Sequence, residues 1–475
     1  MKSIIRSTLL FTLGLTLLSS CQEVNPVLEV EGGQIQGIET ATKGIIAYKG
    51  IPFAAPPTGE NRWKEPQAVI PWEGVKVCDT FSAPCYQAKH SGGGYTPEFF
   101  FDGDPEFSED CLYRNIWTPA AGKTNAKLPV TMWIHGGAYT GGWGFEPEMD
   151  GEEWAKHDAI IVTINYRLGI YGFFTHPLLS KESPHGVSGN YGLMDQIAAL
   201  KWVKKNIQAF GGDPDKITIM GQSAGARSVE YLIASPLAKD MISGAIIQSG
   251  AVYTKTAASS IPAMAAAEQA GQTVMDWAGC QTLEQMRALS SDELMTLSAR
   301  YQKATRERAG ISTSPVKDSY VMADDFAAAA FNAQIADVPY MIGCTLDDMG
   351  DRSIGIDQFC MARETAGKEA YAYQFQRRLP TDGRKDVLEG AFHSSELWFM
   401  FKSLRFCWRP FTKGDYDLAE RMITYWTNFS RYGNPNGKKE GEWKPLTRIQ
   451  RDFMLLRLDG QEMEDSGMGQ PNQAE

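Results

Sequence analysis

A serine between two glycines is the first candidate for chemistry in this sequence. Ser223 stands in Gly221-Gln222-Ser223-Ala224-Gly225, which fits the Gly-x-Ser-x-Gly pattern of a sharp turn that exposes a serine hydroxyl. Residues 216–220 favour a strand and helix-forming residues follow the motif, so we expect a strand, a tight turn and a helix. A hydroxyl at a helix N-terminus, where developing negative charge is favoured, could attack a carbonyl carbon.

An unactivated serine is a weak nucleophile, so it needs a histidine base and a carboxylate that orients the histidine. Where a serine occupies this kind of turn, the acid and then the histidine follow it in the chain. Only His393 lies well beyond Ser223, whereas His135 precedes it and is expected to be structural. The histidines of the chain are His90, His135, His157, His176, His185 and His393.

The acid must then lie between Ser223 and His393. Asp347 and Asp348 directly follow a predicted strand at 339–345, and catalytic groups of open α/β sheets lie at strand ends. The order of residues leaves both aspartates open as the acid. A second pair, Asp324 and Asp325, precedes an alanine-rich run, so we interpret it as a helix cap and a first-turn charge.

The oxyanion that forms after attack needs backbone N–H donors already in place. The segment Trp133-Ile134-His135-Gly136-Gly137-Ala138-Tyr139 ends a predicted strand in small residues, which let the backbone approach a substrate oxygen. A further donor is the amide of Ala224, directly after the nucleophile. Removing one such donor typically lowers the rate by about 10²–10³-fold.

The elements that must hold these residues alternate between strands and helices. The apolar runs at 128–135 and 159–166 are typical of central parallel strands, which helices cover on both faces. The pattern therefore predicts an α/β fold with a mostly parallel sheet. Further strands are expected at 216–220, 245–248 and 339–345, and helices at 191–210, from 224 onward, at 257–308 as a layer over the sheet, and at 415–432.

These residues together resemble the type-B carboxylesterase family, which includes cholinesterases and bacterial para-nitrobenzyl esterases. The resemblance covers most of residues 30–437. Besides the serine and His-Gly-Gly segments, it rests on Gly50-Ile51-Pro52-Phe53-Ala54 with Pro56, Pro57 and Arg62; Ser108 to Asn115; Asn165-Tyr166-Arg167; Asn190-Tyr191-Gly192-Leu193 with Asp195 and Gln196; Phe210 to Pro214; Gln248-Ser249-Gly250; and Asn428-Phe429 ahead of Gly433-Asn434-Pro435-Asn436.

The resemblance implies an α/β-hydrolase fold and hydrolysis of small-molecule carboxylic esters through an acyl-enzyme, without a metal or other cofactor. Carried over by position, it implies Ser223 as nucleophile, Asp348 as acid and His393 as base. It also implies oxyanion amides at Gly137, Ala138 and Ala224, and a disulfide between Cys85 and Cys111.

The sequence departs from the family pattern around the candidate site. Gln222 stands where a glutamate is usual, Asp348 is one methylene shorter than the more frequent glutamate, and Ser394 replaces a glycine. The loop between Cys85 and Cys111 lacks the tryptophan that cholinesterases place against a quaternary ammonium, so choline esters are not expected. Acid and base are also unusually close in sequence, which predicts a more open site that accepts bulky esters.

Two other functions remain to be weighed. A catalytically silent binding protein of the same fold would typically lack the nucleophile, which is present here. A true lipase would need an apolar lid, and the short segment between Asp348 and His393 leaves little chain for one.

The N-terminus indicates export. Lys2 and Arg6 precede an apolar run at 7–18, and Leu18-Ser19-Ser20-Cys21 resembles the lipobox of bacterial lipoproteins, in which the cysteine carries lipid. We therefore expect a signal peptide at 1–20, a single hydrolase domain at 21–475, and a protein anchored in a bacterial envelope through Cys21 or otherwise secreted or periplasmic.

With 43% hydrophobic residues and a net charge of −11, the 475-residue chain can form a large core and is not expected to bind nucleic acid. The oligomeric state is left open.

Overall fold

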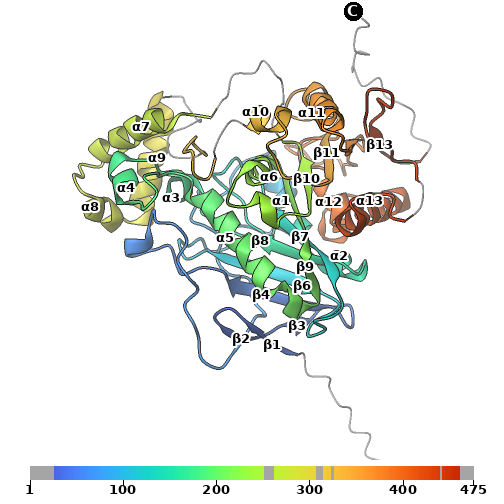
Figure 1. The fold of residues 1–475 in the computed structure, drawn as a ribbon, viewed down its shortest axis with the longest axis horizontal. Helices are drawn as coiled ribbons and strands as arrows, with labels where there is room; N and C mark the ends of the chain where they lie inside the picture. Colours follow the sequence, from blue (N-terminus) through green and yellow to red (C-terminus); the bar gives the residue numbers. More distant parts are fainter. Residues whose placement is uncertain (1–25, 251–260, 306–313, 323–325, 439–440, 460–475) are drawn as a thin grey trace, which may run out of the picture.

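The computed structural model describes residues 26–250, 261–305, 314–322, 326–438 and 441–459. Within these residues, ten strands form a central sheet in the order β13-β12-β11-β10-β9-β7-β8-β6-β4-β3 (Figure 1). The strands from β13 to β8 run parallel, and β6, β4 and β3 continue the sheet in antiparallel pairs. This sheet confirms the predicted α/β class. The expected signal peptide and Cys21 lie outside the described residues, as do Asp324 and Asp325.

The strands are short at the N-terminus and longest at the centre. A second, small sheet has the order β1-β2-β5. The bounds are β1 (Val27–Val30), β2 (Gly33–Gln36), β3 (Ile38–Glu39), β4 (Ile46–Pro52), β5 (Val75–Val77), β6 (Tyr113–Thr118), β7 (Leu128–Ile134), β8 (Ile160–Ile164), β9 (Gly212–Gln222), β10 (Gly244–Gln248), β11 (Tyr340–Thr345), β12 (Ala370–Phe375) and β13 (Met454–Leu456).

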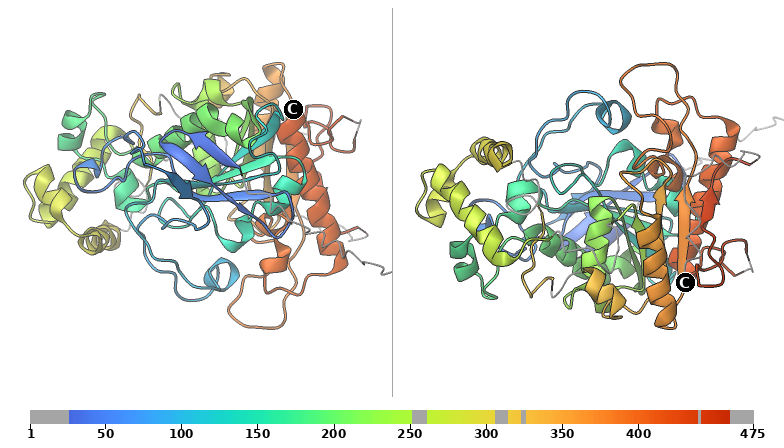
Figure 2. Two further views of the ribbon diagram at one scale, coloured as in Figure 1. Left: turned by 90° about the horizontal axis from the view of Figure 1, so that it is seen from below. Right: turned by 90° about the horizontal axis from the view of Figure 1, so that it is seen from above.

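Helices cover both faces of the central sheet (Figure 2). The α-helices are α1 (Thr96–Phe99), α2 (Glu152–Lys156), α3 (Gly169–Phe173), α4 (Pro177–Glu182), α5 (Tyr191–Asn206), α6 (Ala224–Ala234), α7 (Met264–Trp277), α8 (Leu283–Ala288), α9 (Ser291–Thr305), α10 (Phe326–Phe331), α11 (Ser353–Thr365), α12 (Leu397–Met400) and α13 (Lys413–Tyr432). Short 3-10 helices are η1 (Gly59–Asn61), η2 (Pro147–Met149), η3 (Ile207–Phe210), η4 (Lys239–Met241) and η5 (Leu404–Phe406). No helix within the described ranges combines the length and apolar character needed to span a bilayer.

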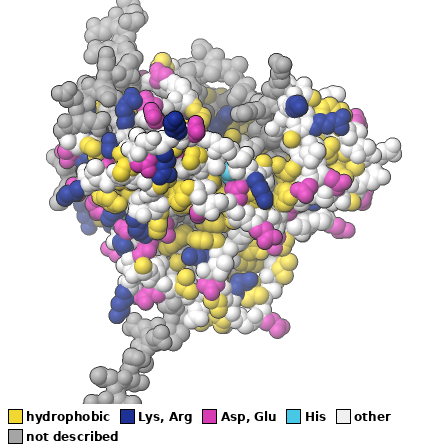
Figure 3. All heavy atoms as spheres, turned by 180° about the vertical axis from the view of Figure 1, so that it is seen from behind, with side chains coloured by type: hydrophobic (Ala, Val, Ile, Leu, Met, Phe, Trp, Pro, Cys, Tyr) yellow, Lys and Arg dark blue, Asp and Glu magenta, His cyan; other side chains and the backbone are white. Residues whose placement is uncertain are grey.

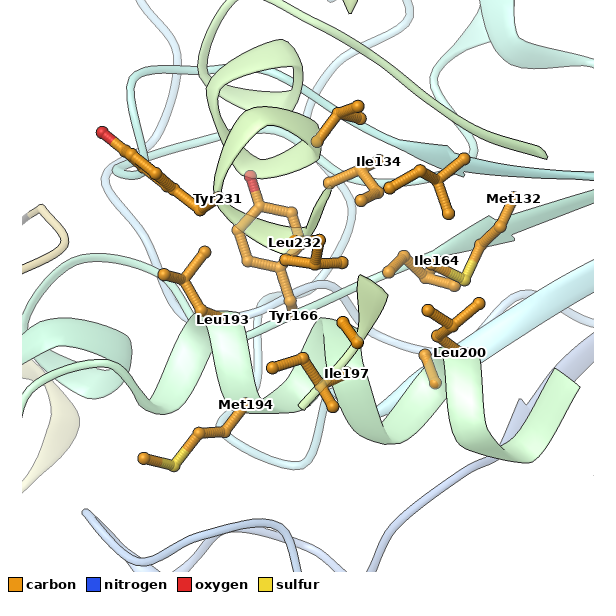
Figure 4. Packing of buried hydrophobic residues seen from close by; sticks show 14 of the residues in the cluster. Met132, Ile134, Ile164, Tyr166, Leu193, Met194, Ile197, Leu200, Tyr231 and Leu232 are labelled. Atoms are coloured by element: carbon orange, nitrogen blue, oxygen red, sulfur yellow. The ribbon is translucent and has the colours of Figure 1, made fainter. Parts of the chain in front are cut away.

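The alternation of side chains along β7 explains why both faces are covered. Met132 and Ile134 belong to one core, which α5 and α6 complete, and Figure 4 shows them facing residues of these helices. Trp133 points the other way, into a second core that includes α13. Because successive side chains of a strand point to opposite faces, an apolar run such as this strand needs a helical layer on each side.

The segment at 257–308 differs from the prediction in its position. Its described part forms α7, α8 and α9, as the composition indicated, but these helices pack mainly on α3, α4 and η1 rather than over the sheet. They lie at one end of the molecule, opposite the end that carries α13 (Figures 1 and 2). Helix-forming composition predicts a helix but does not say which surface the helix covers.

The parallel register places three strand ends side by side. Gln222 at the end of β9 pairs with Gln248 at the end of β10, and Gln248 pairs with Gly343 near the end of β11. The residues that follow these strands therefore leave the sheet at the same edge, which is where ligand sites of open α/β sheets form.

Candidate active site

Ser223 lies on a strained turn between β9 and α6. Its φ of 58° and ψ of −122° are unusual for a residue with a side chain, as expected for a serine that a sharp turn presents to a pocket. A Cβ added to Gly225 would lie 2.0 Å from the carbonyl oxygen of Ile134, so the turn requires glycine there. Ser223 is half-buried, and its N–H donates to the carbonyl of Gln248 at 2.9 Å. The side chain therefore lies at the sheet edge and reaches solvent.

The structure brings the predicted acid and base together. Asp348 Oδ1 lies 2.7 Å from His393 Nδ1, and both side chains are buried. Ser249 Oγ donates to the other carboxylate oxygen at 2.6 Å. Burial alone would raise the pKa of Asp348, but the hydrogen bond and charge of His393, the charge of Arg352 and the hydrogen bond from Ser249 hold that pKa well below its usual range. Asp348 is thus an ionised carboxylate that orients the imidazole.

Asp347, the other candidate acid, has a different position. Its N–H donates to the carbonyl of Ala391 at 3.0 Å, and its side chain accepts from the N–H of Ala391 at 2.9 Å. Its carboxylate is partly exposed and lies 3.4 Å from Arg378. The geometry separates the two aspartates: Asp348 contacts the imidazole, and Asp347 holds the backbone that leads into His393.

Gln222 contacts Nε2, the other nitrogen of the His393 imidazole. Its Nε2 lies 3.2 Å from His393 Nε2. An amide nitrogen can only donate, so this contact matches the tautomer with its proton on Nδ1, in which the unprotonated Nε2 accepts from Gln222. The hydrogen bonds within the described residues include none between Ser223 and His393. Nucleophile–base hydrogen bonds are often long before substrate binds, and here the imidazole faces the residue next to the nucleophile.

Ser394, directly after His393, stands where the family pattern usually has glycine. Ser394 has a φ of 79°, in the left-handed region that glycine adopts most easily. The family's usual glycine therefore corresponds to a real conformational demand of this loop, which the serine meets with some strain.

The segment after β7 lies against the nucleophile with free amides. Gly137 and Ala138 have φ values of 94° and 54°, and a Cβ added to Gly136 would lie 3.1 Å from Ser223 Cβ. Within the described residues, the N–H groups of Gly137, Ala138 and Ala224 donate no hydrogen bond. Three unused donors close to a serine hydroxyl are what an oxyanion needs.

His135 is buried beside this segment and is not placed to act as the base. Its Nδ1 bonds the carbonyl of Gly136 at 2.9 Å, and its ring stacks on Tyr166. Burial lowers the pKa of His135 to about 4, although the bond to Gly136 opposes this shift. The imidazole is therefore neutral and supports the backbone of the loop, as the chain order predicted.

Three residues that contact or face this site were not predicted to act in it: Ser249, Arg352 and Glu396. Ser249 directly follows β10, so its place at a strand end was a usable signal. Glu396 is fully buried three residues after the base, and nothing in its local sequence marks it. Arg352 donates to Asp348 from the residue before α11, and its spacing of four from Asp348 is also common in surface ion pairs.

The predicted disulfide between Cys85 and Cys111 is absent from the structure. Both residues are buried free thiols. The Cys85 sulfur accepts the N–H of Leu168 at 3.2 Å. Burial, followed by the hydrogen bond with Cys85, raises the pKa of Cys111 well above its usual value. The two thiols are therefore neighbours that interact without a covalent bond.

Within the described ranges, no group of three or more histidine, cysteine, aspartate or glutamate side chains could hold a metal ion.

Comparison with known proteins identifies relatives along nearly the whole chain. The model of the "Carboxylesterase family" matches residues 24–353 and 349–473. Fumonisin B1 esterase of Sphingopyxis macrogoltabida is 36% identical over 71% of this chain and 59% of its own length. Para-nitrobenzyl esterase of Bacillus subtilis is 30% identical over 90% of this chain and 94% of its own. A Geobacillus stearothermophilus carboxylesterase structure superposes with a TM-score of 0.73 and 28% identity, over 91% of this chain and 96% of the other.

Proposed function

Because this chain belongs to the carboxylesterase family, we propose that it hydrolyses esters with Ser223 as nucleophile, His393 as base and Asp348 as orienting acid. Hydrolysis of carboxylic esters is the activity of the family. The observation that carries the residue assignment is the 2.7 Å contact between Asp348 and His393, whose Nε2 faces the turn of Ser223. This is the relation between acid and base that a serine hydrolase needs.

The first half of the reaction forms an acyl-enzyme. His393 Nε2 takes the proton of the Ser223 hydroxyl, and Ser223 Oγ forms a bond to the ester carbonyl carbon. The negative charge on the carbonyl oxygen is stabilised by the free amides of Gly137, Ala138 and Ala224. The carbon–oxygen bond to the alcohol then breaks, and the alcohol leaves with the proton held by His393.

The second half releases the acid with water as the co-substrate. His393 takes a proton from water, and the hydroxide attacks the acyl carbon through the same oxyanion arrangement. The bond to Ser223 Oγ breaks, the serine regains its proton from His393, and the carboxylic acid departs. Asp348 stays ionised throughout and stabilises the imidazolium that forms in each half.

The neutral side chain of Gln222 bears on the choice of ester. It replaces a carboxylate beside the imidazole, so the site offers less attraction to a cationic alcohol group. Together with the short segment between acid and base, this favours bulky, uncharged esters as substrates.

The two aspartates give the sharpest test of the assignment. Asp348→Asn should lower kcat for a p-nitrophenyl acyl ester by about 10⁴-fold, because the amide favours the wrong imidazole tautomer. Asp347→Asn should cost far less, because that carboxylate contacts backbone and Arg378. Steady-state kinetics of both variants, with circular dichroism to verify folding, makes the comparison. A larger loss for Asp347→Asn would overturn the assignment.

For localisation, the proposal rests on the N-terminal sequence. The positive residues, the apolar run and Cys21 support export with a lipid anchor in a bacterial envelope.

A further inference from the structure

We propose that Arg352 is a positioning residue of the catalytic acid, holding the short Asp348 side chain between two strand-end loops. This inference rests on the proposed role of Asp348 as the acid. Neither the sequence pattern nor the family resemblance assigned a role to Arg352.

The contacts of Arg352 join two separate loops. Its Nε donates to Asp348 Oδ1 at 2.9 Å, and Nη1 donates to the carbonyl oxygen of Gly250. Asp348 follows β11, whereas Gly250 lies two residues after β10. Ser249, the neighbour of Gly250, bonds the other oxygen of the same carboxylate at 2.6 Å. One guanidinium thus ties together the loop that carries the acid and the loop that carries its second hydrogen-bond donor.

The location of Arg352 is unfavourable for an ordinary surface arginine. It is the N-cap residue of α11, and its own side chain makes no cap hydrogen bond there. N-caps favour Ser, Thr, Asp and Asn, and a cation at a helix N-terminus opposes the helix dipole. The side chain is only 14% exposed. A largely buried cation at such a position needs a compensating partner, and Asp348 provides it.

We call the two contacts of Arg352, to Asp348 and to the carbonyl of Gly250, the Arg352 clamp. The short side chain of Asp348 is the reason for its proposed role. Aspartate is one methylene shorter than the glutamate usual at this position of the family, so its carboxylate reaches less far from the backbone. The guanidinium is planar, and its two donors have fixed directions that can hold the carboxylate and a carbonyl at once. Arg352 therefore fixes the backbone that places the shorter side chain against His393.

The same contact changes the electrostatics of the site. Arg352 and His393 share Asp348 Oδ1, so the positive charge of the arginine helps to keep the acid ionised. The other titratable groups that face this carboxylate are Tyr95 before α1, Cys344 on β11, Tyr373 on β12 and Glu396 after the base. Burial raises the pKa of each of these four groups, so all are predominantly uncharged at neutral pH.

Two further carboxylates lie nearby, Asp351 and Asp347, and Asp351 accepts from the N–H and hydroxyl of Ser353. Asp347 faces Ala391 and Arg378, not the imidazole. Arg352, by contrast, contacts the carboxylate of the acid directly.

The test measures kcat and KM of the full-length protein with a p-nitrophenyl acyl ester. Arg352→Gln should lower kcat about tenfold through misplacement of the acid, with KM within about twofold. Arg352→Lys keeps the charge but not the two fixed donors, so it should recover only part of kcat.

A matched control contacts the same helix from another segment. Arg451, which precedes β13, pairs with Asp357 of α11 at 2.7 Å without contacting the acid. Arg451→Gln should leave kcat and KM unchanged. Equal effects of Arg352→Gln and Arg451→Gln would show that only the stability of α11 matters and would overturn the proposal.

A longer acid tests the clamp itself. In an Asp348→Glu background, Arg352→Gln should lower kcat by less than about threefold, because a glutamate needs less help to reach His393. An undiminished loss would contradict the length argument.

Asp348→Asn separates this inference from the proposed function. If that variant stays active, the acid assignment itself fails. If it is inactive while Arg352→Gln matches wild type in kcat, only the role of Arg352 fails.

Discussion

At the scale of the residue, Glu396 shows how burial sets protonation beside the acid. The side chain is completely buried, and burial followed by the neighbouring charge of Asp348 raises its pKa to about 8, although Gln248 and Arg352 oppose the shift. An unfolded glutamate has a pKa near 4.3. Between these values the folded protein retains a proton that the unfolded chain releases. A neutral carboxylic acid therefore lies behind the ionised Asp348, and the site avoids two adjacent negative charges.

This protonation gives stability a pH dependence of known sign. As pH rises from about 5 to 8, the free energy of unfolding should fall by up to about 1.4 kcal/mol per pH unit. The reason is that the folded protein keeps the Glu396 proton over this range, whereas the unfolded chain releases it. Glu396→Gln removes this slope, so the Tm of the variant minus that of the wild type should increase from pH 5.5 to pH 8. Differential scanning calorimetry at several pH values measures this difference.

A matched control for this measurement is Glu420→Gln. Glu420 is more exposed, and its pKa is lowered by the hydrogen bond from Lys402 despite partial burial, so it is already ionised across this range. Parallel Tm curves for wild type and Glu396→Gln would contradict the account.

At the scale of the element, the contact between β7 and the start of α6 positions the nucleophile. Gly225 lies so close to β7 that a Cβ would come within 2.0 Å of the carbonyl oxygen of Ile134. Gly225→Ala should therefore displace the turn and lower both Tm and kcat, the latter by at least about 10²-fold. Gly414→Ala is the matched control, because its Cβ would meet nothing closer than a Leu458 methyl group at 3.5 Å. Thermal unfolding and ester hydrolysis of both variants test this, and a fully active Gly225→Ala protein would be incompatible with it.

The same scale shows what a sequence can predict. The strand, turn and helix around Ser223 were predictable because local glycine requirements and apolar runs coincide there. Chain order reduced the candidates for the base to His393 and the candidates for the acid to a few aspartates. It cannot distinguish the adjacent Asp347 and Asp348, which only the direction of each side chain separates. The clamp by Arg352 depends on a contact between two loops that are about one hundred residues apart in the chain, at Gly250 and Arg352. No local pattern encodes such a contact, just as none indicated that α7–α9 would pack at one end of the molecule.

At the scale of the whole molecule, charges of both signs are mixed over the surface that Figure 3 shows. The net charge is −11, yet the face shown in Figure 3 carries interspersed acidic and basic side chains with hydrophobic side chains between them. No broad basic field on this face would attract a polyanion. The proposal of a membrane anchor rests on the N-terminal sequence alone.

The lipobox-like segment makes that expectation testable. On expression in a bacterium, the wild-type protein should fractionate with membranes and enter the detergent phase, because lipid on Cys21 anchors it. Cys21→Ser should move the protein to the soluble fraction with unchanged kcat after purification. Identical fractionation of the two proteins, or a mature N-terminus elsewhere than residue 21, would refute the lipoprotein proposal.

The central claim is that Ser223 is a nucleophile activated by His393, and covalent labelling with a fluorophosphonate tests it most directly. Intact-mass spectrometry of the folded protein should show one adduct, and peptide mapping should place it on Ser223. His393→Ala should slow labelling by several orders of magnitude, because the hydroxyl loses its base. Absence of labelling in folded wild-type protein, or an adduct on another residue, would contradict the account.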